Sequence, residues 1–169
     1  MGIRYYAYAF DADRTEEALK DPMSVISDDP LADAWGMEPG FTVGVIGERE
    51  PAPERDLLYL DKAWSQLQWV VASLETQGDG AYRMFVGDVS MTDRGWIPWS
   101  RTITPDEALR VRDGLASISD EDVERVLRRQ GRRPPMGPDT DDLLHFLGKA
   151  RAFVDQVVRE GRGFAYMIG

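Results

Sequence analysis

The sequence contains no cysteine and only one histidine among its 169 residues. Without cysteine there is no disulfide, no thiolate nucleophile and no cysteine-ligated zinc or iron–sulfur site. The single histidine, His145, excludes metal sites built from several imidazoles and leaves one imidazole as a candidate base. Much of the side-chain chemistry used by enzymes and metalloproteins is therefore missing.

Long apolar runs are missing as well. No stretch approaches the roughly 20 apolar residues that cross a bilayer, and residues 1–5 lead into a strand-like pattern instead of a signal peptide. Neither a Gly-x-Gly-x-x-Gly nor a P-loop pattern occurs, so the ordinary phosphate cradles of nucleotide-binding proteins are not expected. We therefore expect a cytoplasmic protein with no membrane segment, no metal and no cofactor.

Acidic residues outnumber basic ones by 30 to 20, giving a formal charge of −10. Residues 1–60 alone contain 13 acidic and five basic residues. Such a surface disfavours nucleic acid, because a phosphate backbone must be neutralised by clustered Lys and Arg. It suits a basic partner, although acidic surfaces also simply keep proteins in solution. Five arginines are clustered near residue 130 without aromatic residues between them, so ion pairing or solvation explains them better than nucleic-acid binding does. They are Arg125, Arg128, Arg129, Arg132 and Arg133.

Apolar periodicity and start signals predict the elements of the fold. Hydrophobic residues make up 43% of the chain, which indicates a packed globular domain. Helices are predicted at 14–20, 61–74, 104–118, 119–129 and 140–160, and a short one is predicted to begin at Pro22. Strands are predicted at 3–10, 41–47, 82–86, 97–103 and 164–168. We expect one α/β domain over residues 1–169, with α+β as the other arrangement, in which helices flank a mixed sheet containing the N- and C-terminal strands.

The segment LYLDKAWSQLQWVVAS at 58–73 resembles the signature of the YfbM-like family, small bacterial proteins grouped as a domain of unknown function. The resemblance continues through Ile-Thr-Pro-Asp-Glu at 103–107, Ile-Ser-Asp-Glu at 118–121 and the closing GRGFAYMIG. It implies an α/β fold and brings no established catalytic residues. Members often have histidines where Ser65 and Gln68 stand, so no histidine-based activity carries over.

Residues 61–64 allow two interpretations. In the functional one, Asp61 and Lys62 face a polar ligand and Trp64 forms the wall of a pocket. In the structural one, Asp61 caps a helix, Lys62 is solvated and Trp64 belongs to the core. An apolar stripe favours the structural interpretation: Leu60, Trp64, Leu67, Val71 and Leu74.

The FDADRT sequence after the first strand matches the Asp-x-Asp-x-Thr pattern of haloacid-dehalogenase-type phosphatases. There Asp11 would attack phosphorus, Asp13 would act as general acid/base, and a magnesium ion would offset the charge. Lys62 and Asp88 follow in the matching order. Two features argue against a phosphatase of this type. Arg14 occupies the position where such enzymes usually have a glycine, and the tyrosines of the first strand differ from the apolar residues of a central parallel strand.

Two further features have simpler structural explanations. His145 borders the apolar stripe of the last helix, which favours a structural or surface role, and no Gly-x-Ser-x-Gly motif accompanies it. Asp139, Asp141 and Asp142 lack the spacing of a calcium loop and fit the negative charge preferred at a helix N-terminus.

The hypothesis that follows is a non-catalytic binding or interaction module with a protein or small-molecule partner. A magnesium-dependent phosphatase and an acidic, immunity-type protein that neutralises a basic partner are its alternatives. Nucleic acid and membrane are not expected as partners, and a homodimer is left open.

Overall fold

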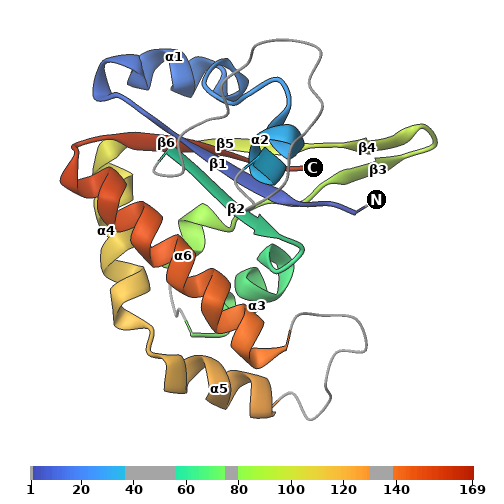
Figure 1. Cartoon of the computed structure of the whole chain (residues 1–169), viewed down its shortest axis with the longest axis vertical. Coiled ribbons are helices and arrows are strands. Elements are labelled where there is room, and N and C mark those ends of the chain that lie inside the picture. The colour runs from blue at the N-terminus through green and yellow to red at the C-terminus, as the bar shows by residue number, and fades with distance from the viewer. Residues whose placement is uncertain (1, 37–55, 75–79, 130–138) are drawn as a thin grey trace.

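A four-stranded sheet in the order β2-β1-β6-β5 organises the chain. Its strands are β1 (Tyr5–Phe10), β2 (Leu57–Asp61), β5 (Trp99–Ile103) and β6 (Gly163–Ile168), and their pairings are antiparallel. The computed structural model describes residues 2–36, 56–74, 80–129 and 139–169. Figure 1 shows the first and last strands side by side within the sheet. The predicted fold class, helices flanking a sheet that contains both of these strands, is confirmed.

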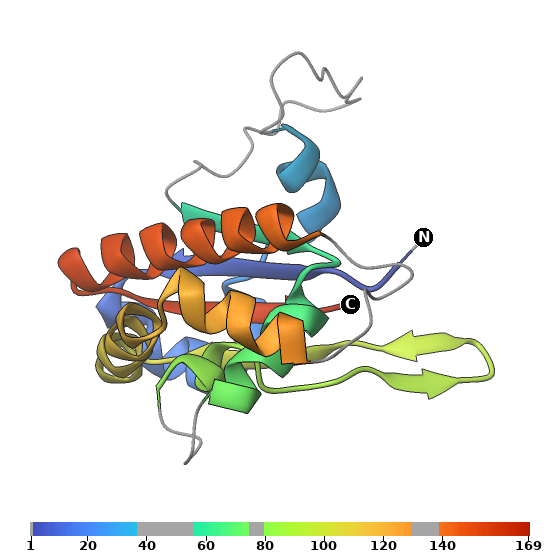
Figure 2. The ribbon, with the colours of Figure 1, turned by 90° about the horizontal axis from the view of Figure 1, so that it is seen from below.

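Helices cover both faces of this sheet (Figures 1 and 2). One face carries α3 (Trp64–Leu74), the 3-10 helix η4 (Ala81–Met84), α4 (Pro105–Ser117), α5 (Asp120–Arg129) and α6 (Thr140–Arg159). The other carries α1 (Thr15–Lys20), η2 (Pro22–Ser24) and α2 (Pro30–Gly36), after the 3-10 turn η1 (Ala12–Arg14). None of the described helices is long and apolar enough to span a membrane.

Strand β1 is buried on both sides because its side chains alternate between two cores. Tyr5 and Ala7 pack with the α3–α6 layer, whereas Tyr6, Tyr8 and Phe10 pack with α1 and α2. The tyrosines are tolerated inside because their hydroxyls find acceptors, such as Met84 O at 2.8 Å from the Tyr5 hydroxyl. A tyrosine-rich strand thus occupies the interior of an antiparallel sheet.

The starts of the helices predicted at 104–118 and 140–160 are confirmed by the cap geometry at Thr104 and Asp139. The Thr104 hydroxyl accepts from the Glu107 N–H at 3.2 Å, and the Glu107 carboxylate accepts from the Thr104 N–H at 3.1 Å. The Asp139 side chain accepts from the Asp142 N–H at 2.9 Å. The aspartates at 139–142 therefore act at a helix N-terminus, as expected.

Two predicted elements are wrong. The helix expected from Asp61 begins at Trp64, because Leu60 and Asp61 are the last residues of β2. Asp61 has φ 46° and turns the chain between the two elements, so it does not cap α3. Residues 82–86, expected as a strand, form part of η4 and the loop after it.

The predicted strand at 97–103 is interrupted at Pro98. Before Pro98, β3 (Ser90–Thr92) and β4 (Gly95–Ile97) form a separate antiparallel hairpin that the sequence analysis did not anticipate. We call residues 90–97 the arm, because Figures 1 and 2 show this hairpin extending away from the helices and the main sheet. The predicted strand at 41–47 lies outside the described residues.

The substitution Thr104→Ala removes one half of the α4 capping box. We expect the free energy of unfolding to fall by about 1 kcal/mol, because the N–H of Glu107 loses its side-chain acceptor. Urea denaturation followed by circular dichroism measures the change. Thr140→Ala, at the exposed first position of α6, is the control. Equal losses in the two variants would contradict the cap assignment.

Candidate functional site

Asp61 lies in a polar cluster that joins β1 to β2. Its Oδ1 accepts hydrogen bonds from the Arg4 Nε and the Tyr59 hydroxyl, each at 3.0 Å. The Tyr59 ring stacks on that of Tyr6, with 5.3 Å between centroids. Burial, followed by the hydrogen bond to Asp61, raises the pKa of Tyr59 well above its usual range. Tyr59 therefore stays a neutral donor, and Asp61 is held in an ion pair.

Trp64 and Lys62 lie near Asp61 but do not form an open pocket with it. Trp64 is only 7% exposed and packs in the core under the α3–α6 layer. Its indole N–H donates to the Ile3 carbonyl at 3.2 Å. The exposed Lys62 lies with its aliphatic end against the backbone of Gly2. The positions of Lys62 and Trp64 agree with the structural interpretation of residues 61–64, whereas the helix cap that it assigned to Asp61 does not form.

The residues of the phosphatase alternative are distributed over two ends of the sheet. Asp11 follows Phe10, which pairs with Gly163 at one end. At the other end Trp99 pairs with Ile168, which also pairs with Tyr5. Gly87 lies against the Trp99 ring, so the neighbouring Asp88 is at this second end of the sheet. Asp88 and Asp11 are therefore separated by the length of β1, about 20 Å at roughly 3.3 Å per residue.

Lys62 is on the far side from Asp11 as well, because it follows Asp61, the pairing partner of Tyr5. A magnesium ion binds its oxygen ligands at about 2.1 Å, so a single ion does not bridge Asp11 and Asp88 in this arrangement. Asp13 lies in η1, next to Asp11, and is exposed. The described ranges contain no group of three or more His, Asp or Glu side chains placed to hold a metal ion.

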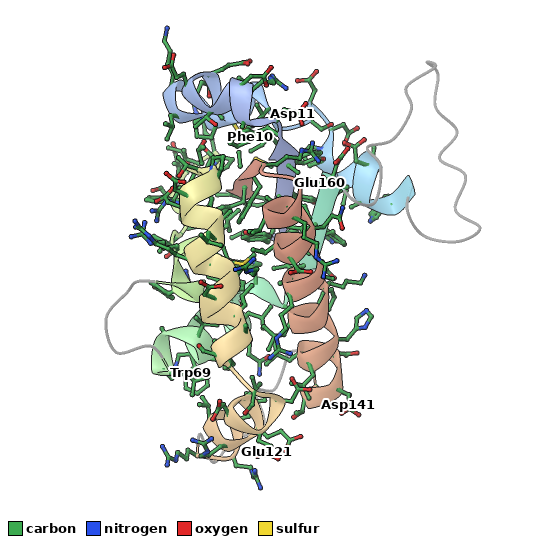
Figure 3. The ribbon with its side chains drawn as sticks, turned by 90° about the vertical axis from the view of Figure 1, so that its left-hand side faces the viewer. Phe10, Asp11, Trp69, Glu121, Asp141 and Glu160 are labelled. Atoms are coloured by element: carbon green, nitrogen blue, oxygen red, sulfur yellow. The ribbon has the colours of Figure 1, made fainter. Side chains whose placement is uncertain are left out.

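Asp11 instead belongs to an ion-pair cluster around Arg162. The guanidinium of Arg162 lies 3.0 Å from the Asp11 carboxylate, 2.5 Å from Asp56 and 3.3 Å from Glu160. Figure 3 shows Asp11 and Glu160 at the same end of the molecule, beside Phe10. The cluster joins the end of β1, the start of β2 and the turn between α6 and β6.

Arg162→Met would leave these carboxylates close together without their cation. We expect a loss of about 2 kcal/mol of unfolding free energy, because the guanidinium is only 15% exposed and its partners repel one another. Chemical denaturation measures the loss. Arg159→Met, which removes an exposed pair with Asp155, should change stability by less than about 0.5 kcal/mol. Similar effects of both substitutions would refute the linking role.

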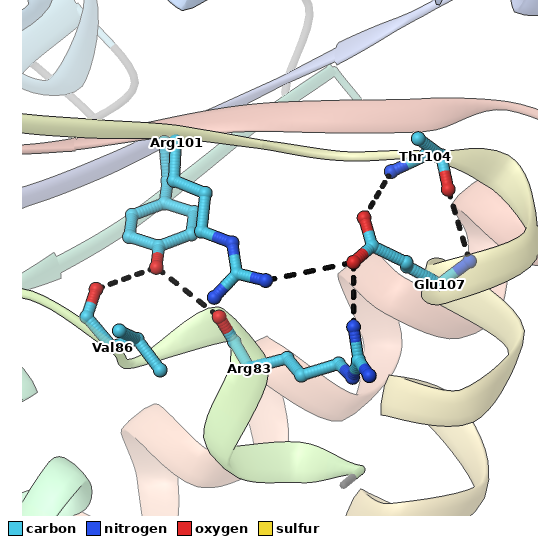
Figure 4. A network of polar contacts seen from close by, with 6 residues as sticks. Arg83, Val86, Arg101, Thr104 and Glu107 are labelled. Atoms are coloured by element: carbon cyan, nitrogen blue, oxygen red, sulfur yellow. Dashed lines mark hydrogen bonds and ion pairs between the residues drawn. The ribbon is translucent and has the colours of Figure 1, made fainter. Parts of the chain in front are cut away.

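A second polar network fastens the loop after η4 to the sheet (Figure 4). The Tyr166 hydroxyl lies 2.6 Å from the Val86 carbonyl oxygen and 3.1 Å from that of Arg83. The Glu107 carboxylate accepts from Arg83 at 2.6 Å and pairs with Arg101 at 3.5 Å. Burial raises the pKa of Tyr166 well above its usual range. The network therefore holds a neutral tyrosine, which is suited to positioning the loop.

The side chain of Trp99 rests directly on this loop at Gly87. Gly87 has φ +129°, and a Cβ there would lie 2.2 Å from the nearest ring atom of Trp99. Only glycine permits this contact, since any side chain would occupy the position of the indole. The amide of Gln68 donates to the carbonyls of Phe85 and Gly87 and fixes the loop beneath the ring.

Gly87→Ala tests this contact against a matched glycine. Gly95 has nearly the same φ, +128°, but nothing lies within 4 Å of its Cβ position. We expect Gly95→Ala to cost about 1 kcal/mol from backbone strain alone, and Gly87→Ala to cost at least about 1 kcal/mol more because Trp99 must move. Thermal unfolding of both variants measures the difference. No difference would contradict the packing of Trp99 on Gly87.

The arm and the start of β5 expose large apolar side chains, which the sequence analysis missed. Met91 is 70% exposed, Ile97 59%, Trp99 40% and Trp96 38%. The available signal was the Asp93-Arg94-Gly95 turn between alternating apolar residues.

The other sequence candidates lie on the surface. His145 is exposed, and its ring contacts Phe146 edge-on at 5.8 Å between centroids. Arg125 pairs with Asp122, and Arg128 with Glu124, on the exposed side of α5. These contacts agree with the ion pairing expected for the arginine cluster, whose last two members lie outside the described residues.

The antiparallel sheet with helices on both faces defines an α/β protein with a YfbM-like fold. A solved structure with this fold is that of YfbM from Escherichia coli, a protein of unknown function. It superposes with a TM-score of 0.52 at 15% sequence identity, covering 99% of this chain and 100% of that one. The similarity concerns the fold alone. No family model matches the sequence, and the search of curated proteins finds no match.

Proposed function

We propose that this protein is a non-catalytic binding module whose contact surface is formed by the arm and strand β5. The observation that carries the proposal is the set of exposed apolar side chains on a projecting hairpin: Met91, Trp96, Ile97 and Trp99. Met91 and Trp96 are cross-strand partners and share one face of the arm, and Ile97 lies on the other face. Exposed apolar and aromatic residues on a projecting element mark surfaces that bind other proteins. Tryptophan in particular supplies much of the binding energy at such surfaces.

The shape of this surface favours a protein over a small molecule as the partner. Small-molecule sites are concave and surround most of the ligand, whereas the arm projects from the body (Figure 2). A two-stranded hairpin alone is only marginally stable in water. A partner that covers the arm would therefore both bury its apolar side chains and order its backbone.

Two of the carboxylates named as candidate site residues have structural partners, which supports the same proposal. The ligand-binding candidate Asp61 pairs with Arg4, and the phosphatase candidate Asp11 pairs with Arg162. The acidic, immunity-type alternative stays a separate prediction. It depends on exposed acids such as Asp13 and Glu16, which follow the end of β1 distant from the arm.

The proposal extends to membership of the YfbM-like family. Leu-Asp-Lys-Ala-Trp at residues 60–64 and the closing GRGFAYMIG carry the sequence resemblance. The shared fold over nearly the whole chain supports it.

Ile97→Asp places a charge on the proposed contact surface, at a side chain that is 59% exposed and therefore outside the core. Proteins captured from a native lysate by the tagged wild-type chain should be lost with Ile97→Asp, because a buried carboxylate has no partner in an apolar interface. Leu109→Asp, on an apolar residue of α4 that is likewise exposed, is the matched control. Capture unaffected by Ile97→Asp would contradict the proposal, and salt-sensitive capture of a basic protein in both variants would favour the acidic alternative.

A further inference from the structure

The outer edge of the arm indicates which partner the proposed surface fits. We infer that the arm binds a second copy of this chain, with the two β3 strands pairing antiparallel about a two-fold axis at Met91. The inference rests on the proposed function, because it assigns a partner to the same hairpin.

Strand β3 is the outermost strand of the arm and has one edge without a partner. It pairs with β4 and with no other strand in the described part of the chain. β4 leads into β5, which pairs with β6, and β3 lies on the side of β4 away from β6 (Figure 2). The arm extends past the described helices in Figures 1 and 2. The outer edge of β3 is therefore placed to accept a strand from another chain.

The turn of the hairpin determines which backbone groups face that edge. A two-residue turn joins Thr92 to Gly95, and a hairpin of this kind closes with a hydrogen-bonded pair at the two flanking residues. Hydrogen-bonded and non-hydrogen-bonded pairs alternate along an antiparallel ladder. The N–H and C=O of Met91 therefore point away from β4, toward the outer edge. Two copies related by a two-fold axis at Met91 would exchange two hydrogen bonds between these groups.

Side chains on either side of Met91 are complementary in this register. Arg94 of each copy lies opposite Asp88 of the other, so the axis makes this pair of opposite charges twice. Both side chains are exposed, and no ion pair among the described residues uses either of them. Ser90 lies opposite Thr92 of the other copy, and two hydroxyls in this position form a favourable cross-strand pair.

Neighbouring registers lack this complementarity. Moving the axis one residue toward the tip of the arm places Met91 opposite Asp93, an apolar side chain against a carboxylate. Moving it one residue the other way places Asp88 opposite Thr92. Neither register pairs the opposite charges, so the register centred on Met91 is favoured.

The same register joins the exposed apolar side chains of the two arms. Trp96 pairs with Met91 within one arm, so four apolar side chains form a row across the two arms on one face. In the single copy Met91 is 70% exposed and Trp96 38%. Contacts between a thioether and an aromatic ring are favourable. One four-stranded sheet also replaces two separate hairpins, each of which is only marginally stable alone.

The composition of β3 does not protect its edge. Natural edge strands avoid association by means of lysine, proline or a bulge, and residues 89–92 contain no charged residue and no proline. Residues 90–97 contain one acidic and one basic residue, so two neutral arms meet in a chain whose net charge is −10. The exposed acids of η1 and α1 follow the opposite end of β1, and repulsion beyond about 8 Å is largely screened at physiological ionic strength.

Charge reversal tests the pairing of Arg94 with Asp88. Sedimentation analysis of the purified full chain should show a concentration-dependent dimer. Asp88→Arg and Arg94→Asp should each raise its dissociation constant at least about fivefold, because like charges then lie opposite each other. The double variant Asp88→Arg/Arg94→Asp should restore the constant to within about twofold of wild type. Glu16→Arg, at an exposed acid of α1, is the control and should leave it unchanged.

The absence of native cysteine allows a direct test of the register. In Met91→Cys the two introduced side chains lie opposite each other across the axis, with about 5 Å between their Cβ atoms. Mild oxidation or a short thiol cross-linker should therefore give a covalent dimer. Thr92→Cys, on the next residue of the same strand, is the control. Its side chain points to the other face and lies opposite Ser90 of the second copy, so it should cross-link at least about fivefold less.

A wild-type chain that stays monomeric at the highest concentration measured would overturn the inference. A dimer that the double charge reversal does not restore, or that cross-links through Thr92→Cys as readily as through Met91→Cys, would overturn it too, because the copies would then meet in another register or on another surface. None of these results refutes the proposed function, which fails only if capture of partner proteins does not depend on the arm.

Discussion

The antiparallel pairing of β1 with β6 is the constraint on which the rest of the structure depends. The two strands pair from Tyr5 and Ile168 to Phe10 and Gly163, and each has another strand on its far side. Their side chains must therefore be covered above and below. This requirement places helices on both faces of the sheet, and it leaves β2 and β5 as the two strands at its edges.

Buried tyrosine hydroxyls join this sheet to the surrounding segments by hydrogen bonds. A hydroxyl inside a protein needs a partner, and here Tyr5, Tyr8 and Tyr166 reach Met84 O, Asp33 and Val86 O. The bond from Tyr5 holds the last residue of η4, and the bond from Tyr166 holds the loop after it. That loop presents Gly87 to Trp99, so the packing of the core also determines where β5 begins and how the arm leaves the body.

Charged side chains are distributed differently at the strand ends and on the arm. Carboxylates at the strand ends are joined to arginines that connect distant segments, as Asp61 is to Arg4 and Asp56 is to Arg162. The arm has almost no net charge and several exposed apolar side chains. Under the proposed function, association through the arm would require little removal of water from charged groups.

The sequence by itself determined the elements whose signals are local. The helices α4 and α6 and the first and last strands were all predicted with nearly correct bounds. Only the tertiary structure decided the outcome where side chains distant in sequence intervene. Residues 82–86 favour a strand by composition, but hydrogen bonds from Tyr166 and Gln68 to their carbonyls stabilise a turn instead. Asp11, Lys62 and Asp88 follow in catalytic order along the chain, yet the register of an antiparallel sheet separates them. Strand register and side-chain hydrogen bonds are long-range interactions, and no local pattern encodes them.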